Sequence, residues 1–300
     1  MEAKGSALPS IPDTIEYLAG APHKVILVDN TSSGAIAEAY PEFLRRGISI
    51  ITPNKKAFSG SYNLWQDIFS AAQSGSSMVY HESSVGAGMP IISTLKELVQ
   101  TGDEVTRIEG VFSGTMSFLF NQFSPTAGRA GKWSETVKMA KELGYTEPDP
   151  RDDLNGLDVA RKLTILGRLA GLPIESPASF PVQSLIPQEL TDCANSDEFL
   201  SRLHEFDDRM EDKKHLAEKA GKVLRYVGSI EMSTKKVKVG MEMFDATHAI
   251  ATLKGSDNII SFFTKRYGEM PLTIRGAGAG GDVTAMGVTG DLLKVLCQMS

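Results

Sequence analysis

The chain has 300 residues, of which 41% are hydrophobic and 23% are charged, and its formal net charge is −6. This length and composition can form the buried core of two domains or of one large domain. Acidic and basic residues are mixed along the chain, which argues against nucleic acid as a partner because a phosphate backbone requires a basic surface.

The sequence shows no targeting or membrane segment. No apolar run approaches the roughly 20 residues that span a bilayer, and residues 1–14 contain no apolar secretory segment. Two cysteines, Cys193 and Cys297, are too few for a disulfide framework and are typical of a reducing compartment. We therefore expect a cytoplasmic protein without a membrane partner.

The first clear unit in chain order is a strand, a helix and a strand. The apolar run 24–28 predicts a strand. Ile36, Tyr40 and Leu44 recur at helical spacing, and the run 48–51 predicts a second buried strand. Because the turns between these elements are short, we predict a right-handed parallel βαβ unit.

The remaining elements continue this alternation and then change mainly to strands. Further helices are predicted at 62–70, 90–100, 116–120, 134–143, 152–170, 195–220 and 283–297. Further strands are predicted at 78–80, 107–112, 223–232, 235–243, 258–264 and 272–275. Ser134 is expected to cap its helix, and 152–170 is expected to form one long helix.

These elements predict the α/β fold class. The first part is typical of a Rossmann-type parallel sheet, and the later part is typical of an α+β domain with a mixed sheet. We assign residues 1–80 to the first domain, with residues 281–300 returning to it. Residues 81–280 form the second domain.

A glycine-rich segment, 276–281, satisfies the G-x-G-x-x-G spacing between a predicted strand and a helix. Only 19 residues follow Gly281, so no second strand or ribose-binding acidic residue can complete a dinucleotide site. Two interpretations stay open, a tight turn between packed elements and a secondary contact with a bound cofactor. The motif occurs nowhere else, so the sequence has no primary pyrophosphate loop.

Two polar clusters follow the first two predicted strands, where ligands of parallel sheets bind. Thr31 and Ser32 lie in the first cluster, and their side chains suit a helix cap as well as a ligand contact. Lys55 and Lys56 lie in the second. A solvated lysine is the simpler interpretation, but Lys55 follows a proline-stiffened turn that favours contact with a carboxylate or phosphate.

A third cluster, 145–153, is acidic and precedes Asp158 and Lys162. These two residues are four apart and therefore share one helical face. An exposed pair of this kind contributes only about 0.3–0.5 kcal/mol, but many leucines in this helix predict its burial. Several carboxylates and one lysine at a helix start suit a small substrate that carries an ammonium group and a hydroxyl or carbonyl group.

The segments VDNTSSGAIAEAY, ISIITPNKKAFS, YHESSVGAGMPIIS, EGVFSGTMSF, GYTEPDPRDDLNGLDVARKLTILGR and RGAGAGGDVTA resemble those of fungal homoserine dehydrogenases. The resemblance covers nearly the whole chain. It implies NAD(P)H-dependent reduction of L-aspartate 4-semialdehyde to L-homoserine, in the pathway to threonine, methionine and isoleucine. It also implies a truncated Rossmann domain, because the family begins with a strand, a G-x-G-x-x-G loop and a helix, roughly 60 residues that are absent here.

The resemblance also implies a role for individual residues. Lys162 would be the acid/base catalyst, and Asp158 would position it and the substrate. The substrate pocket would contain Glu147, Asp153, Tyr145, Gly114, Thr115 and Lys55. NADP or NAD would contact Thr31, with Ser32 beside it, and also Lys55 and Gly280. A structural sodium ion would be bound, largely through main-chain oxygens, by Glu82, Val85, Ala87 and Met89. The chain would form a homodimer through its strand-rich later part.

Two other functions are considered. A cofactor-free, silent subunit that pairs with or regulates a complete enzyme is supported by the missing fingerprint. An aspartate-semialdehyde dehydrogenase would require a cysteine nucleophile. Cys193 lies in a polar segment and Cys297 in the terminal helix, so neither cysteine fits that role.

Overall fold

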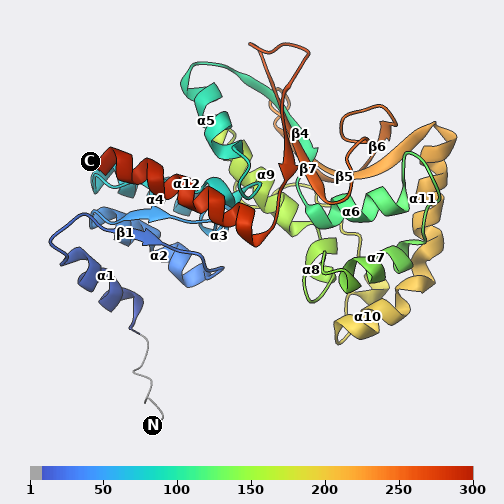
Figure 1. Ribbon diagram of the computed structural model, residues 1–300, viewed down its shortest axis with the longest axis horizontal. Coiled ribbons are helices and arrows are strands. Elements are labelled where there is room, and N and C mark those ends of the chain that lie inside the picture. The colour runs from blue at the N-terminus through green and yellow to red at the C-terminus, as the bar shows by residue number, and fades with distance from the viewer. Residues whose placement is uncertain (1–8, 300) are drawn as a thin grey trace, which may run out of the picture.

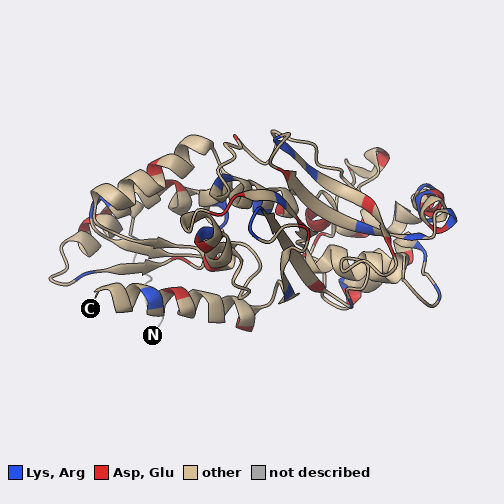
Figure 2. Cartoon of the chain, turned by 90° about the horizontal axis from the view of Figure 1, so that it is seen from above, with Lys and Arg blue, Asp and Glu red and all other residues tan. Residues whose placement is uncertain are grey.

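The computed structural model describes residues 9–299 and contains two β-sheets. Figure 1 shows them side by side along the long axis, with the first sheet at the left and the second in the centre and to the right. Residues 1–8, in which the sequence predicts no secretory signal, lie outside the described residues. None of the helices in the described part is long and apolar enough to cross a membrane. Figure 2 shows basic and acidic residues interspersed over both ends, as their mixing in the sequence predicts.

The first sheet is parallel and has the order β1-β2-β3. Its strands are β1 (Ile26–Val28), β2 (Ser49–Ile51) and β3 (Val79–Tyr80). They are connected by α2 (Gly34–Arg45) and α4 (Tyr62–Ser74), which confirms the predicted βαβ arrangement. The α2 helix begins where the Ser33 hydroxyl accepts a hydrogen bond from the amide of Ile36 at 3.3 Å.

The last helix, α12 (Gly281–Met299), lies against this first sheet on the side opposite to α2 and α4 (Figures 1 and 2). Gly287 allows α12 to approach the turn that follows β3 closely. A Cβ atom there would lie 2.2 Å from the Ser83 hydroxyl and 2.9 Å from the Ala87 carbonyl oxygen. The C-terminal helix is thus packed beside strands from the beginning of the chain.

The second sheet has the order β6-β5-β4-β7-β8, and all four pairings of these strands are antiparallel. Its strands are β4 (Val105–Val111), β5 (Lys222–Glu231), β6 (Lys236–Asp245), β7 (Asp257–Thr264) and β8 (Leu272–Ala277). A parallel bridge between Val182 and Val239 adds the predicted mixed character. The α9 helix (Leu157–Leu169) packs closely on this sheet, because Gly228 has no side chain to separate it from Leu163.

The other helices surround these two sheets. They are α1 (Ile11–Ala19), α3 (Lys56–Ser59), α5 (Ile91–Gln100), α6 (Gly114–Phe123), α7 (Trp133–Glu142), α8 (Arg151–Leu154), α10 (Ser196–Arg202) and α11 (Asp207–Lys219), with short 3-10 turns at η1 (Glu82–Ser84), η2 (Gln188–Leu190) and η3 (Leu203–Phe206). The sequence analysis missed α1 and α3. The signal for α1 was present, because Ser10 caps it and Pro12 stands in its first turn.

Two local predictions are wrong. The expected helix 152–170 is two helices, α8 and α9, because Gly156 adopts a φ of 75° and interrupts the helix between them. Ser134 does not cap its helix, whose N-cap is Lys132. Instead, the Ser134 amide and hydroxyl donate to the carboxylate of Asp207 at 2.8 and 2.7 Å, a partner distant in the sequence.

Candidate active site

A cavity of about 870 Å³ lies between the two parts of the molecule, the first part containing the parallel sheet and the second part containing the five-stranded sheet. Loops and the first turns of helices from both parts form its wall. Of the residues that the sequence analysis assigns to a site, the wall contains Lys55, Ala87, Gly114, Thr115, Tyr145, Glu147, Asp153, Asp158, Lys162 and Gly280. The structure therefore brings most of the predicted substrate and catalytic residues to one place.

Asp158 lies between two lysines in this cavity. Its carboxylate is 2.7 Å from the Lys162 ammonium, which belongs to the same helix, and 3.1 Å from the Lys55 ammonium, which follows β2. Lys162 is only 7% exposed and also donates to the Phe112 carbonyl oxygen at 2.6 Å. The pair is therefore not an ordinary solvated ion pair, and its geometry fixes the Lys162 amine in the cavity wall.

The two lysines determine the protonation of Asp158. Burial by itself raises the pKa of this carboxyl group, but the positive charges of Lys162 and Lys55 outweigh burial. The pKa of Asp158 is consequently held far below its ordinary value. Asp158 is therefore an anion at neutral pH.

This shift predicts how stability depends on pH. Because the folded state holds the lower pKa, the unfolded chain binds the proton first as the pH falls. The stabilisation by Asp158 is therefore complete well above its unfolded pKa of about 3.9 and declines below about pH 4. We expect the difference in unfolding free energy between the wild type and Asp158→Asn to be constant from pH 7 to 5 and to shrink from pH 4 to 3.

Urea unfolding at each pH measures this difference. Asp212→Asn, on an exposed position of α11, is the control and should change the unfolding free energy little at any pH. A difference between the wild type and Asp158→Asn that grows as the pH falls would contradict the assigned sign.

Asp153 organises the acidic loop at the start of α8. One of its carboxylate oxygens accepts from the Glu147 amide at 2.8 Å, and the other lies 2.8 Å from the Thr115 hydroxyl. That hydroxyl is also 2.6 Å from the Tyr145 carbonyl oxygen. The Tyr145 ring stacks on Phe118 with centroids 4.2 Å apart. Partial burial raises the pKa of Asp153, because it disfavours the charged carboxylate.

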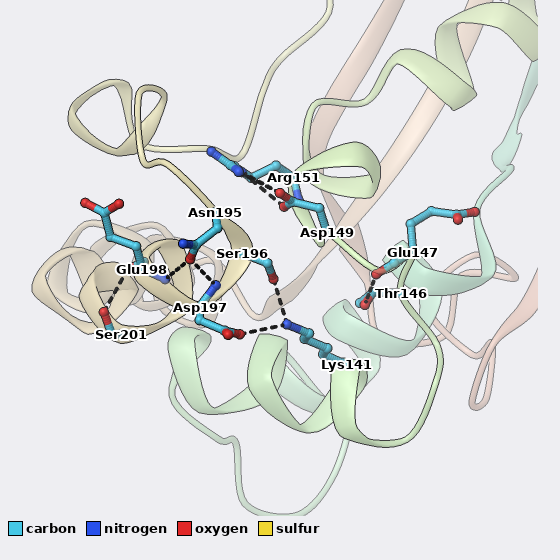
Figure 3. A network of polar contacts seen from close by, with 10 residues as sticks. All are labelled: Lys141, Thr146, Glu147, Asp149, Arg151, Asn195, Ser196, Asp197, Glu198 and Ser201. Carbon is cyan, nitrogen blue, oxygen red and sulfur yellow. Dashed lines mark hydrogen bonds and ion pairs between the residues drawn. The ribbon is translucent and has the colours of Figure 1, made fainter.

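Asp149 and Arg151 hold the same loop from the side remote from Glu147. The Arg151 guanidinium donates to Asp149 at 2.6 Å and to the Cys193 carbonyl oxygen at 2.7 Å. Figure 3 shows the Glu147 side chain pointing away from this pair. The pair therefore supports the loop, and the Glu147 carboxylate stays available to the cavity.

Neither cysteine belongs to the candidate active site. Cys193 is buried, Cys297 is exposed on α12, and neither is in the cavity wall. A cysteine-based aspartate-semialdehyde dehydrogenase is therefore not supported by the geometry.

Thr31 and Ser32 are exposed and do not reach the cavity wall. The Thr31 amide donates to Asp29 at 2.8 Å, and the Thr31 hydroxyl accepts from the Ser33 amide at 3.1 Å. Ser33, not Ser32, is the cap of α2. Their predicted contact with a cofactor stays a prediction.

The glycine-rich segment at the end of β8 lines the cavity with residues 277–280. Gly280 has a φ of 121°, which residues with a side chain rarely adopt. A Cβ atom on Gly278 would lie 2.0 Å from the Asn258 amide nitrogen. Gly278 thus allows the end of β8 to pack against β7. Gly280 leaves the main chain open to the cavity.

The residues predicted to bind sodium do not all line the same cavity. Ala87 is in the main cavity wall, but the Glu82 side chain lies at a second cavity of about 450 Å³. The Glu82 carboxylate accepts from the amides of Ile92 at 2.7 Å and Ser93 at 3.0 Å, at the start of α5. In the described part of the chain, no three acidic, histidine or cysteine side chains form a metal cluster.

Two residues of the wall, Ser256 and Thr284, were not predicted from the sequence. Ser256 lies in a turn before β7, and Thr284 lies in the first turn of α12. Ser256 belongs to none of the segments that resemble the family, and Thr284 belongs to the segment RGAGAGGDVTA but was given no role there.

Comparison with known proteins gives matches over almost the whole chain. Residues 3–82 match the family described as "Homoserine dehydrogenase, NAD binding domain", and residues 90–293 match the family "Homoserine dehydrogenase". A homoserine dehydrogenase of Emericella nidulans is 66% identical over 291 residues, which cover 95% of this chain and 79% of that relative.

Solved structures show the same likeness. A Candida auris protein of unknown function has a TM-score of 0.95 and 49% identity, covering 99% of this chain and 83% of that one. A hyperthermophilic archaeal homoserine dehydrogenase solved in complex with NADPH has a TM-score of 0.68 and 25% identity, covering 91% of this chain and 72% of that one.

Proposed function

The chain belongs to the homoserine dehydrogenase family, and from this premise we propose that its cavity reduces L-aspartate 4-semialdehyde to L-homoserine with NADPH or NADH. One observation carries the proposal. Asp158 and Lys162 from the second part of the chain meet Lys55 from the first part inside a single cavity. A hydride acceptor and a hydride donor must meet at such a junction of a substrate domain and a nucleotide domain.

Each of these residues has a separate role in the proposed reaction. Glu147 and Asp153 bind the substrate ammonium group, and Asp158 fixes Lys162 beside the aldehyde oxygen. When bound, a nicotinamide cofactor would supply the hydride that the aldehyde carbon needs. Lys162 gives its proton to the alkoxide that forms, which completes the alcohol, and regains a proton from water.

The chain's residues fit a nicotinamide cofactor at this place. Gly280 gives a ligand access to the main chain, and Lys55 offers a positive charge on the side of the first sheet. We propose that Thr31 and Ser32 extend this contact at the end of β1.

Two measurements test the function. Addition of aspartate semialdehyde to the purified chain with NADPH should cause oxidation of NADPH. No oxidation would contradict the proposal. Titration with NADPH addresses the cofactor-free subunit separately, because binding at micromolar concentration excludes it and no binding at millimolar concentration favours it. That alternative is not favoured by the match of residues 3–82 to a NAD-binding domain.

Glu147→Gln should raise the KM for aspartate semialdehyde by about 10- to 100-fold and change kcat less. A hydrogen bond to a charged group contributes about 1.5–3 kcal/mol, and the substitution keeps the shape of the side chain while removing its charge. Steady-state kinetics measure both constants. Glu142→Gln, on an exposed position of α7, is the matched control. An unchanged KM in Glu147→Gln would remove this residue from the ammonium site.

We also propose a structural sodium ion at main-chain oxygens of residues 82–89. The turn is tightly bent, with φ values of 79° at Gly86 and 53° at Ala87. Within the described residues, no donor is hydrogen-bonded to the carbonyl oxygens of Val85 and Ala87. Free carbonyl oxygens in a buried turn suit a hard cation. The main-chain oxygens of Glu82 and Met89 already accept from the amides of Val85 at 3.3 Å and Ile91 at 2.8 Å, and each would offer its second lone pair to the ion.

A homodimer and a cytoplasmic location complete the proposal. The strand register places a polar row across all five strands of the second sheet: Lys238, Ser229, Glu109, Ser261 and Thr273. The neighbouring isoleucines of these strands point to the other face and belong to the main hydrophobic core. The face that carries this polar row also carries Val111, Val227 and Ile259 of a second hydrophobic cluster, and it is the face through which two copies would pair.

A further inference from the structure

The short segment around α3, residues 54–60, carries Lys55 and is held at both of its ends. At the front, Asn54 is 4% exposed. Its side-chain amide donates to Asp29 at 3.2 Å and to the Ser33 carbonyl oxygen at 3.0 Å. The side-chain oxygen of Asn54 accepts from the Lys56 amide at 3.1 Å. Asn54 therefore connects the loop after β2 to the loop after β1.

At the back, Arg168 connects the segment to α9. This residue is 6% exposed, and its guanidinium donates to the carbonyl oxygens of Phe58 at 2.7 Å and Gly60 at 2.6 Å. It also donates to the carbonyl oxygens of Ile174 and Glu175, both at 2.9 Å. Burial lowers the pKa of Arg168 to about 10, so the group stays charged at neutral pH. A cation at the carboxyl end of α3 is also favoured by the helix dipole.

Arg168 belongs to the same helix as Asp158 and Lys162. A helix is rigid, and ten residues of it span about 15 Å. The position of Arg168 therefore sets where α3 meets α9, and α3 in turn sets where Lys55 meets Asp158. We propose that Arg168 is a positioning residue, which holds the Lys55-bearing segment against the catalytic helix so that Lys55 pairs with Asp158.

This role rests on the proposed function, since Lys55 is assigned there to the cofactor and substrate. A purely structural role for Arg168 is the competing explanation, because any buried arginine that binds carbonyl oxygens stabilises the fold. The chain contains a matched residue that separates the two. Arg225 is 2% exposed and donates to the carbonyl oxygens of Ser124 at 2.8 Å, Leu224 at 2.6 Å and Ala251 at 2.7 Å. Its pKa is also lowered by burial to about 10, and these three partners all lie in the second part of the chain.

The first experiment measures how readily the Lys55 amine reacts with an acylating reagent, and it does not depend on activity. Trace acylation of the folded chain, followed by peptide mass spectrometry, gives the labelling rate of Lys55 relative to Lys213 on α11. Arg168→Met should raise the relative rate by about threefold or more, because the ion pair with Asp158 is released, whereas Arg225→Met should not. Equal rates for Lys55 in both variants would overturn the proposal. Should Arg168→Met not fold, Asn54→Ala releases the other end of the segment and should give the same selective increase.

The second experiment measures coupling in catalysis. Arg168→Met should lower kcat by about tenfold or more, with a smaller change in KM, and Arg225→Met should leave kcat of the folded protein unchanged. In a Lys55→Ala background, Arg168→Met should cause no further loss, because both substitutions remove the same interaction. If the losses in kcat of Lys55→Ala and Arg168→Met add in the double variant, Arg168 does not act through Lys55. If the wild-type chain does not oxidise NADPH, the proposed function is rejected. The positioning role of Arg168 is tested independently of this result, because the acylation rates of Lys55 do not depend on activity.

Discussion

Replacing Lys162 with alanine is expected to lower kcat for NADPH oxidation by about 10²- to 10⁴-fold, the usual contribution of a positioned general acid. Lys162 is almost fully buried, and both Asp158 and the Phe112 carbonyl oxygen hold its ammonium group. Water in the vacated space would donate a proton far less effectively, because it is neither fixed nor charged. Steady-state kinetics and thermal unfolding of the same preparation measure the two consequences separately.

Two further variants separate lost chemistry from lost structure. Lys162→Arg keeps a positive charge beside Asp158, but a guanidinium does not release its proton at neutral pH. This variant should therefore remain nearly as slow as alanine while retaining more stability. Lys213→Ala, at an exposed position on α11, should change neither property. Turnover at the wild-type rate in Lys162→Ala would remove the assignment of the acid catalyst.

Replacing Gly156 with alanine is expected to lower the free energy of unfolding by about 2 to 5 kcal/mol. Two separate costs contribute to this value. Gly156 has a φ of 75°, and a left-handed conformation costs a residue with a side chain about 1–2 kcal/mol. The added Cβ atom would also lie 2.1 Å from the Tyr226 hydroxyl oxygen, and overpacking of a core costs about 1–3 kcal/mol.

The Tyr226 hydroxyl has little freedom to move away. It donates to the Gln183 carbonyl oxygen at 2.6 Å, so relief of the clash would break this hydrogen bond. Gly171 provides a matched control, because it has a φ of 91° and nothing lies within 4 Å of its Cβ position. Gly171→Ala should therefore carry only the conformational cost. Urea unfolding of both variants measures the difference, and equal losses would show that the contact with Tyr226 does not contribute.

Local sequence patterns predicted much of the fold. The spacing of Ile36, Tyr40 and Leu44 predicted α2, and the apolar runs around it predicted β1 and β2, because side-chain periodicity follows directly from backbone geometry. The breaks were harder to predict. The leucine pattern of 152–170 continues across Gly156, so nothing in that pattern reveals that the helix ends and starts again there.

The same distinction applies to the site. The sequence alone determined that Asp158 and Lys162 share a helical face, because residues four apart on a helix must lie side by side. It also identified the acidic loop that contains Glu147 and Asp153. Resemblance to a family supplied the roles of these residues, since spacing by itself could not separate an exposed ion pair from a catalytic one.

Only the tertiary structure decided which distant segments meet. The pairing of Lys55 with Asp158 and the hydrogen bonds from Arg168 to the carbonyl oxygens of Phe58 and Gly60 join residues that are far apart in the chain. Helix and strand periods describe neighbours within one element. The contacts between elements depend on how whole faces pack, where one glycine such as Gly287 or Gly228 permits an approach that any side chain would prevent.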